Sequence, residues 1–225
     1  MTRIHDMGGR FGDGPVKPDF GEVSVFEEEW HARTLALTVA AGFLGQWNLD
    51  ESRHRRECLS PVDYIKFSYY EKWLAGLADI LVAKGIVTKD ELETLNPEPT
   101  QQTLQKYVLS ADNVFSKLRK GGPTYRDVGS QVKFKVGDKV ITSPVGNKNV
   151  SGGHTRLPTY AAGKKGRILL YHGRHVFSDS NAHGMGEAPE PLFTVAFSAN
   201  DLWKHAENPK DMIMLDLWQS YLSSI

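Results

Sequence analysis

The spacing of hydrophobic residues changes near residue 120 of this 225-residue chain. Before that point, apolar residues recur every three or four positions, which is typical of amphipathic helices. After it, short runs alternate between apolar and polar residues, which is typical of half-buried strands. The pattern predicts an α+β fold in which a helical part precedes a part rich in strands.

Local signals place several ends of the predicted helices. Asn48, with Glu51 three residues later, forms a capping-box pattern. Pro61 suits the first turn of a helix, and Gly85 suits a helix end. The predicted helices span residues 25–44, 48–59, 60–84, 88–95 and 100–118.

The second half of the chain contains several predicted strands, and Gly137 with Asp138 forms a turn signal between the first two. The predicted strands span residues 132–136, 139–142, 166–171, 192–197 and 212–217. Several short strands within about ninety residues indicate a small barrel, because closure removes exposed strand edges. We expect an SH3-like β barrel.

The first 24 residues are rich in glycine and proline and show neither the helical nor the strand period of apolar residues, which predicts an extended arm. By composition, such an arm is either disordered or laid across another surface. The run Lys120-Gly121-Gly122-Pro123 ends the helical part and favours a linker. The predicted organisation is an arm at 1–24, a helical domain at 25–118, a linker at 119–131 and a barrel domain at 132–225.

The balance of charged residues gives no support to two classes of function, nucleic-acid binding and membrane-surface binding. Lys plus Arg and Asp plus Glu both number 27, so no global attraction to nucleic acid or to a membrane surface is indicated. The apolar run at residues 35–44 is too short to cross a bilayer, and the first residues lack a signal-peptide pattern. A cytoplasmic protein is expected. The one cysteine, Cys58, excludes an internal disulfide and is interpreted as a small apolar helix residue.

Two aromatic residues on the long predicted helix are candidates for a site. Tyr69 and Trp73 are four apart and share a helix face, roughly in line with Ile65 and Leu77. That face is either packed core or the wall of a cavity, where a tyrosine hydroxyl can donate to a substrate. The pattern leaves open a second stripe that could fill the core instead, namely Tyr70, Leu74 and Leu81.

Two arginines differ in their sequence context. Arg53 opens a basic run on a predicted helix, and such a run is usually a solvated face, which fits Arg55 and Arg56. Arg156 follows Gly153 in a glycine-rich turn. The planar guanidinium fork suits paired oxygen atoms. Two arginines from opposite halves of one chain could therefore hold an anionic group supplied by a partner.

The eight histidines are scattered, and no carboxylate–histidine cluster has the spacing of a metal site. His172 and His175 are three apart in a predicted strand or loop and would face differently. We therefore assign no metal ligand and no cofactor-binding residue to this chain.

Several separated segments match one family. They include Ile4-His5-Asp6-Met7-Gly8-Gly9, Asp50-Glu51-Ser52-Arg53, Ser68-Tyr69-Tyr70-Glu71-Lys72-Trp73 and Gly153-His154-Thr155-Arg156. Further matching signatures lie at 171–173, 184–187, 192–197, 201–203, 216–218 and 221–222. Together they resemble the β subunit of nitrile hydratase along essentially the whole chain. The resemblance favours an arm that wraps a partner over a disordered one.

The resemblance implies an enzyme that hydrates nitriles to amides, active only as a complex with an α subunit, either αβ or α2β2. The α subunit would hold Co(III) or Fe(III) in a loop with two oxidised cysteines. Cobalt is favoured, because the family's cobalt-type members commonly carry tryptophan at the position of Trp73. Ser52 replaces the family's usual aromatic residue, so the pocket wall near it departs from the pattern.

The resemblance also assigns roles within this chain. Catalytic roles would fall to Arg53, Tyr69 and Arg156. The two arginines would hydrogen-bond the oxidised cysteine oxygens without touching the metal. Tyr69 would assist by hydrogen bonding or proton transfer, and Leu49 and Trp73 would be walls of the substrate pocket.

Three alternatives remain. Residues 134–140 and 163–168 look like the KOW-type barrel of nucleic-acid-binding proteins, although residues 172–225 are acidic and no stacking platform is evident. Thiocyanate hydrolase uses related subunits, but there the equivalent of this chain is split into two polypeptides. A scaffold without catalytic residues would tolerate substitution of Arg53, Tyr69 and Arg156.

Overall fold

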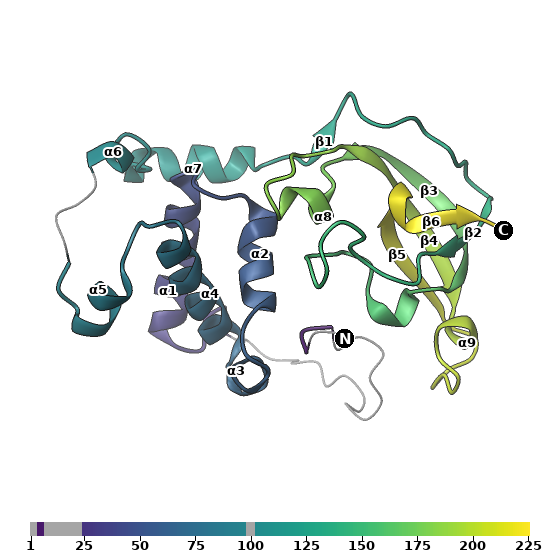
Figure 1. Cartoon of the computed structure of the whole chain (residues 1–225), viewed down its shortest axis with the longest axis horizontal. Coiled ribbons are helices and arrows are strands. Elements are labelled where there is room, and N and C mark those ends of the chain that lie inside the picture. Colours follow the sequence, from purple (N-terminus) through teal and green to yellow (C-terminus); the bar gives the residue numbers. More distant parts are fainter. Residues whose placement is uncertain (1–3, 7–23, 98–101) are drawn as a thin grey trace. The chain divides into compact units, whose positions relative to one another are not determined.

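The computed structural model describes residues 4–6, 24–97 and 102–225 (Figure 1). They form two compact units. The helical unit lies within residues 13–122, and the sheet unit comprises residues 123–225 together with residues 4–6. The helices come first and an antiparallel sheet follows, as the hydrophobic spacing predicts. Of the predicted arm, residues 1–3 and 7–23 lie outside the described residues.

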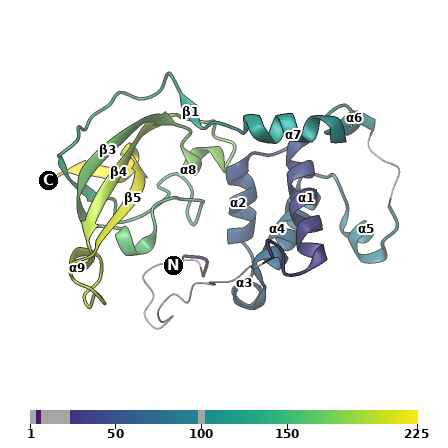
Figure 2. The same cartoon turned by 180° about the vertical axis from the view of Figure 1, so that it is seen from behind.

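The helical unit is organised around α4, which packs against α1 and α2 (Figure 2). Its described helices are α1 (Glu29–Phe43), α2 (Leu49–Glu57), α3 (Pro61–Lys66), α4 (Tyr69–Ala83), α5 (Lys89–Thr94), α6 (Gln102–Gln105) and α7 (Ala111–Lys120). Asn48 caps α2 as predicted. Its Oδ1 accepts from the backbone N–H groups of Asp50 at 3.0 Å and Glu51 at 2.9 Å, which fixes where α2 begins.

Replacing Asn48 with alanine should lower the free energy of unfolding by about 1 kcal/mol, because two backbone N–H groups lose their acceptor. The Asn48→Asp variant keeps an acceptor oxygen and places negative charge at the helix N-terminus, so its stability should stay close to that of the wild type. Urea denaturation of the three proteins measures the difference. Equal stability of the alanine variant and the wild type would contradict the role of the cap.

The single helix predicted over residues 60–84 is wrong, because the chain forms two helices there. Phe67 has an extended backbone (φ −68°, ψ 135°) and ends α3. The backbone N–H of Ser68 then donates to Oε2 of Glu71 at 2.6 Å as α4 begins. This second capping box starts a new helix where the apolar period continues unbroken. Ile65 is consequently on a different helix from Tyr69.

Other predicted helices differ at their ends. The first begins at Glu29 and not at Val25, with Glu28 at its N-cap position. The helix predicted over 100–118 is interrupted, since residues 106–110 separate α6 from α7. Residues 98–101 lie outside the described part. Within the described ranges, the structure has no helix long and apolar enough to cross a membrane.

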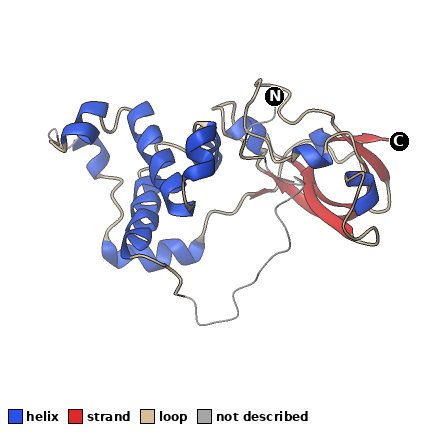
Figure 3. Ribbon diagram, turned by 90° about the horizontal axis from the view of Figure 1, so that it is seen from below, coloured by secondary structure: helices blue, strands red, loops and turns tan. Residues whose placement is uncertain are grey.

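The sheet unit contains one antiparallel sheet, whose strands are red in Figure 3. Neighbouring strands follow the order β5-β4-β3-β2-β6, and β1 pairs with β3. The strands are β1 (Tyr125–Arg126), β2 (Lys139–Thr142), β3 (Lys165–His175), β4 (Glu190–Ser198), β5 (Met212–Trp218) and β6 (Leu222–Ser224). Short helical turns join them: η1 (Thr159–Ala161), α8 (Ser178–Asn181), α9 (Ala199–Leu202) and η2 (Gln219–Tyr221). β4 supplies Phe193, Val195 and Phe197 to the core, all of them fully buried.

The strand predicted over residues 132–136 does not form. The backbone N–H of Lys133 donates to the side-chain oxygen of Gln219 at 2.8 Å, and Nε2 of Gln219 donates to the carbonyl of Gln131 at 2.9 Å. A side-chain amide thus satisfies backbone groups that a neighbouring strand would otherwise pair. The alternating apolar side chains of this segment pack against the core, although its backbone does not pair with a neighbouring strand.

The predicted SH3-like barrel is not confirmed. Among the described residues the sheet has two ends, since β5 and β6 do not pair with each other. β6 has three residues, and the η2 turn redirects the chain between β5 and β6. The sheet therefore stays open.

Candidate active site

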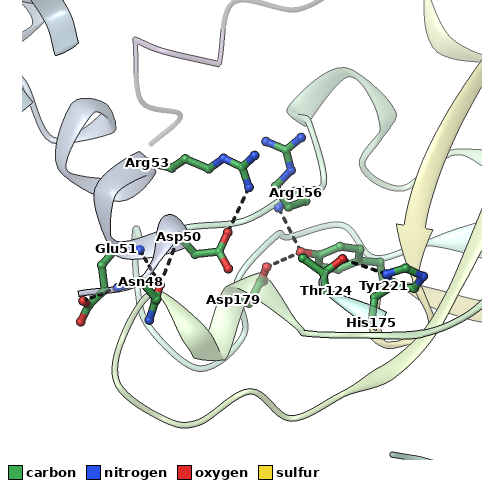
Figure 4. Close-up of polar contacts among 9 residues, drawn as sticks. All are labelled: Asn48, Asp50, Glu51, Arg53, Thr124, Arg156, His175, Asp179 and Tyr221. Carbon is green, nitrogen blue, oxygen red and sulfur yellow. Dashed lines mark hydrogen bonds and ion pairs between the residues drawn. The ribbon is translucent and has the colours of Figure 1, made fainter. Parts of the chain in front are cut away.

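Arg53 lies on α2, close to the start of that helix. Its Nη1 donates to Oδ1 of Asp50 at 3.2 Å (Figure 4). The Arg53 side chain is 38% exposed and that of Asp50 is 10% exposed. Asp50 therefore orients the guanidinium through one nitrogen, and the planar fork can present its other N–H groups to a second acceptor.

The same helix carries a histidine with a strongly raised pKa. The ring of His54 contacts Sγ of Cys58 at 3.7 Å and Oε2 of Glu57 at 3.3 Å. The Cys58 contact and then the Glu57 contact raise the pKa of His54 to about 9. The imidazole is thus charged at neutral pH. The interpretation of Cys58 as a small apolar helix residue is wrong, because Cys58 is exposed at the C-cap of α2 and contacts His54.

Arg56 is not on a solvated face, contrary to the interpretation of the basic run. Its guanidinium lies over the ring of Trp73, 4.5 Å from the ring centroid. Gly76 permits this approach, since a Cβ there would lie 2.7 Å from Cγ of Arg56. Burial lowers the pKa of Arg56. Arg56 therefore joins α2 to α4 and packs against one of the predicted pocket residues.

Tyr69 and Trp73 are neighbours on α4, with ring centroids 5.6 Å apart. Tyr69 is 63% exposed, which leaves its hydroxyl accessible, whereas Trp73 is half-buried. The ring of Tyr70 packs edge-on to that of Tyr69 at 5.1 Å and stacks on His31 at 4.8 Å. Tyr69 is therefore an outward-facing aromatic residue supported by Trp73.

Neither of the two predicted stripes of α4 fills the core as a whole. Leu77 is 7% exposed and Ile80 is 1% exposed, and together with Gly76 they form the buried face. Leu74, from the second stripe, is 44% exposed. The spacing of apolar residues therefore does not distinguish the buried side of α4 from its exposed side.

Leu49 is the first residue of α2 and is 55% exposed. It follows Asn48, whose cap fixes the start of the helix. An exposed leucine held at a rigid helix start can serve as a pocket wall. Its role in a substrate pocket stays a prediction.

Arg156 lies in a loop of the sheet unit, just before η1. Its backbone N–H donates to the hydroxyl of Tyr221 at 3.0 Å, while its side chain is exposed and leads away from the tyrosine ring (Figure 4). The hydroxyl of Thr155 also donates to Tyr221, at 3.1 Å. Tyr221 donates in turn to Oδ1 of Asp179. The backbone that carries Arg156 is thus fixed by buried groups.

The residues before Arg156 are fixed by two further side chains. Nδ2 of Asn147 donates to the carbonyl of His154 at 2.7 Å and to the carbonyl of Asp179 at 3.0 Å. Nε2 of His183 accepts from the backbone N–H of His154 at 3.0 Å. Gly153 is required here, since a Cβ would lie 2.7 Å from Nε2 of His183. The loop is packed too closely for another residue at this glycine.

The residues after Arg156 are anchored as well. Leu157 is 3% exposed and belongs to the core. Asp6 accepts from the backbone N–H of Thr159 at 2.8 Å and from the Thr159 hydroxyl. A described part of the N-terminal arm therefore holds the start of η1, three residues beyond Arg156.

Burial dominates the electrostatics beneath the loop. It raises the pKa of Asp179 from 3.8 to about 6, although the hydrogen bond from Tyr221 and the nearby His154 act in the opposite direction. Burial also raises the pKa of Tyr221, and the Asp179 charge adds to this effect. Tyr221 therefore stays protonated and donates to a carboxylate that is ionised only above about pH 6.

Three residues that support the loop were missed from the sequence: Asn147, Asp179 and Tyr221. Tyr221 belongs to one of the signatures near the end of the chain, but its spacing from Arg156 gives no sign of contact. Asp179 sits in a four-residue helix with no periodic pattern. Only the fold brings these residues together.

The predicted site residues are distributed over both units. Tyr69 and Trp73 are in contact, and Arg53 lies on the adjacent helix α2. Arg156 belongs to the sheet unit. A joint action of Arg53 and Arg156 on one anion therefore stays a prediction.

Comparison with known families gives two matches. The profile described as "Nitrile hydratase beta subunit, N-terminal" matches residues 1–118. The profile described as "Nitrile hydratase beta subunit, C-terminal" matches residues 123–224. The two halves of the chain thus match the two halves of one family.

Individual relatives extend over the whole chain. It is 36% identical over 228 residues to the low-molecular weight cobalt-containing nitrile hydratase subunit beta of Rhodococcus rhodochrous, with 99% of each chain covered. It is 37% identical over 226 residues to the nitrile hydratase subunit beta of Pseudomonas putida, again with 99% of each covered. The thiocyanate hydrolase subunit beta of Thiobacillus thioparus is 36% identical over 93 residues, which cover 40% of this chain and 56% of that subunit.

Proposed function

Since this chain belongs to the nitrile hydratase β-subunit family, we propose that it hydrates nitriles to amides in a complex with an α subunit, as αβ or α2β2. The observation that carries the proposal is the match of both halves of the chain to the family. Both arginine-bearing segments lie inside the matched regions. Thiocyanate hydrolysis is less well supported, because that relative matches 40% of the chain.

The proposal places the metal on the α subunit and favours cobalt, which the name of the Rhodococcus rhodochrous relative includes. When bound there, the metal supplies Lewis acidity and activates water. The residues of this chain fit a supporting role. Arg53 and Arg156 offer only hydrogen-bond donors, which suit anionic oxygens around a metal and cannot coordinate a cation.

In the proposed complex, Arg53 and Arg156 hold those anionic oxygens. Asp50 contacts one nitrogen of Arg53, so this guanidinium is oriented before it meets a partner. Arg156 projects its side chain from a backbone fixed by Tyr221. Pre-oriented donors are effective in a site from which water is excluded, because they need not reorganise during the reaction.

Tyr69 is proposed to face the substrate, with Leu49 and Trp73 as pocket walls. The hydroxyl of Tyr69 can donate a hydrogen bond to a nitrile nitrogen or transfer a proton to it. The ring of Trp73 is held between Arg56 and Tyr69, so it offers a rigid apolar surface. Leu49 adds a further apolar surface at the start of α2.

Replacing Tyr69 with phenylalanine should lower kcat for nitrile hydration about 3- to 10-fold, because one neutral hydrogen bond contributes about 0.5–1.5 kcal/mol. The melting temperature should be unchanged, since the side chain is exposed. Steady-state kinetics and a thermal melt of the complex measure both quantities. Tyr107→Phe, at another exposed tyrosine of the helical unit, is the matched control. A wild-type kcat for Tyr69→Phe would remove this residue from the reaction.

The substrate class is tested by presenting the co-purified complex with an aliphatic nitrile and with thiocyanate in parallel. The proposal predicts amide from the nitrile and little or no turnover of thiocyanate. Turnover of thiocyanate alone would instead support the thiocyanate hydrolase alternative. A complex that turns over neither compound would contradict both.

A further inference from the structure

The hydroxyl of Tyr221 uses its full hydrogen-bonding capacity on the loop of Arg156. It accepts from the backbone N–H of Arg156 and donates to Asp179, as Figure 4 shows. It also accepts from the hydroxyl of Thr155. A hydroxyl has one donor and two acceptor positions, so the two accepted bonds direct its proton toward the carboxylate. Tyr221 and Asp179 are each 1% exposed, and water does not compete for these bonds.

We propose that Tyr221 and Asp179 are positioning residues that fix the backbone at Arg156 and thereby direct its guanidinium. Asp179 acts through Tyr221, because it holds the phenolic proton away from the loop. Tyr221 then presents its oxygen to the Arg156 N–H. The inference rests on the proposed function only for what the guanidinium binds, since the contacts that fix the segment lie within the sheet unit.

Packing alone does not explain this pair. The ring of Tyr221 contacts the rings of Phe177 and Trp218, and a phenylalanine could make the same contacts. Oδ2 of Asp179 is buried and has no hydrogen-bond partner among the described residues. Such a group is costly to bury, and a packed apolar pair is often at least as stable. Packing of the core therefore does not require the polar groups of Tyr221 and Asp179, and these groups act on the loop instead.

The test compares Tyr221→Phe, Asp179→Ala and Asp179→Asn in the αβ complex, with amide hydrogen exchange followed by mass spectrometry. Tyr221→Phe and Asp179→Ala should speed exchange in peptides covering residues 153–157 about tenfold, which corresponds to the loss of one hydrogen bond. Asp179→Asn keeps an acceptor oxygen for Tyr221 and should restore slow exchange. Tyr171→Phe, the same chemical change on β3, should leave the loop unaffected.

Exchange in β4 reports whether a variant has lost its fold in general. If Tyr221→Phe speeds exchange there as well, Asp179→Ala carries the test, because it removes the acceptor of the Tyr221 hydroxyl and leaves the tyrosine ring in place. It should speed exchange at residues 153–157 without affecting β4. Unchanged loop exchange in whichever of Tyr221→Phe and Asp179→Ala keeps slow exchange in β4 would overturn the proposal.

Kinetics separate the positioning role from the proposed function. Tyr221→Phe should lower kcat for nitrile hydration about tenfold with little change in KM, because a displaced guanidinium loses interactions in the transition state. A complex with no nitrile activity but with faster loop exchange in Tyr221→Phe would refute the proposed function and leave the positioning role intact. An active complex whose loop exchange and kcat are unchanged in Tyr221→Phe would refute the positioning role and leave the proposed function intact.

Discussion

Replacing Arg156 with lysine in the αβ complex should lower kcat for nitrile hydration about 10- to 150-fold. A charge-assisted hydrogen bond to an anion contributes about 1.5–3 kcal/mol, and lysine retains the charge but not the planar fork. Arg53→Lys should have an effect of the same order. It also removes the contact with Asp50, which leaves a largely buried carboxylate without its arginine.

The predicted loss comes from the side chain of Arg156 and not from its loop. The bond to Tyr221 is made by the backbone N–H, so lysine at this position retains it. The side chain is exposed, and the free energy of unfolding should therefore stay the same. Arg167→Lys, at an exposed arginine of β3, is the matched control and should keep wild-type kcat. Equal activity of Arg156→Lys and Arg167→Lys would show that Arg156 is a surface residue without a role in the reaction.

The second large effect is a pH-dependent stability difference between the wild type and Asp179→Asn. The folded-state pKa of Asp179 is raised from 3.8 to about 6 by burial, so ionisation of this group destabilises the folded state. Its favourable contribution is complete below about pH 4 and is lost as the pH rises through about 6. Asparagine keeps the acceptor for Tyr221 and does not ionise. Relative to the wild type, Asp179→Asn should therefore gain stability as the pH rises.

A shift of about two pKa units corresponds to about 3 kcal/mol, which is the expected change in the stability difference between pH 4 and pH 7. Urea denaturation of the full chain at several pH values measures it. Glu190 is also buried with a raised pKa, but it is present in both proteins and its contribution cancels. Asp127→Asn, at an exposed carboxylate, serves as the control. A stability difference that stays constant with pH would show that Asp179 does not ionise in this range.

Capping signals predicted helix starts more reliably than the apolar period predicted helix extents. Asn48 with Glu51 placed the start of α2 correctly, because the signal depends on neighbours in sequence. Ser68 with Glu71 is the same signal, but it stands inside an apolar period that continues across it. The period concealed the break at Phe67. The position of Tyr69 at the start of α4, with its side chain exposed, follows from that break.

In the sheet unit, a regular local pattern did not always predict a strand. The strands predicted over residues 192–197 and 212–217 correspond to β4 and β5, which pair with each other in the sheet. Residues 132–136 alternate between apolar and polar side chains, yet they form no strand, and the backbone N–H of Lys133 donates to the side chain of Gln219. The partner lies more than 80 residues away in sequence. No local pattern contains that information.

The candidate site likewise contains some residues that were predicted from the sequence and others that were not. Arg53, Tyr69 and Arg156 were singled out by family resemblance, and the spacing of residues alone did not distinguish them from surface arginines and a packed tyrosine. The groups that hold Arg156 were not predicted, because Asp179 and Tyr221 come from distant segments that meet only in the folded sheet unit. Side chains that act through the backbone of another residue leave no motif at the residue they support.

The measurement that tests the central claim most directly is amide formation from a nitrile, with metal content determined on the same samples. The samples are this chain alone, its α partner alone and the two co-expressed and co-purified. The account predicts that this chain alone is inert and free of cobalt and iron, and that the complex contains the metal and forms amide. Amide formation by this chain alone, or a metal-loaded complex that forms none, would contradict it.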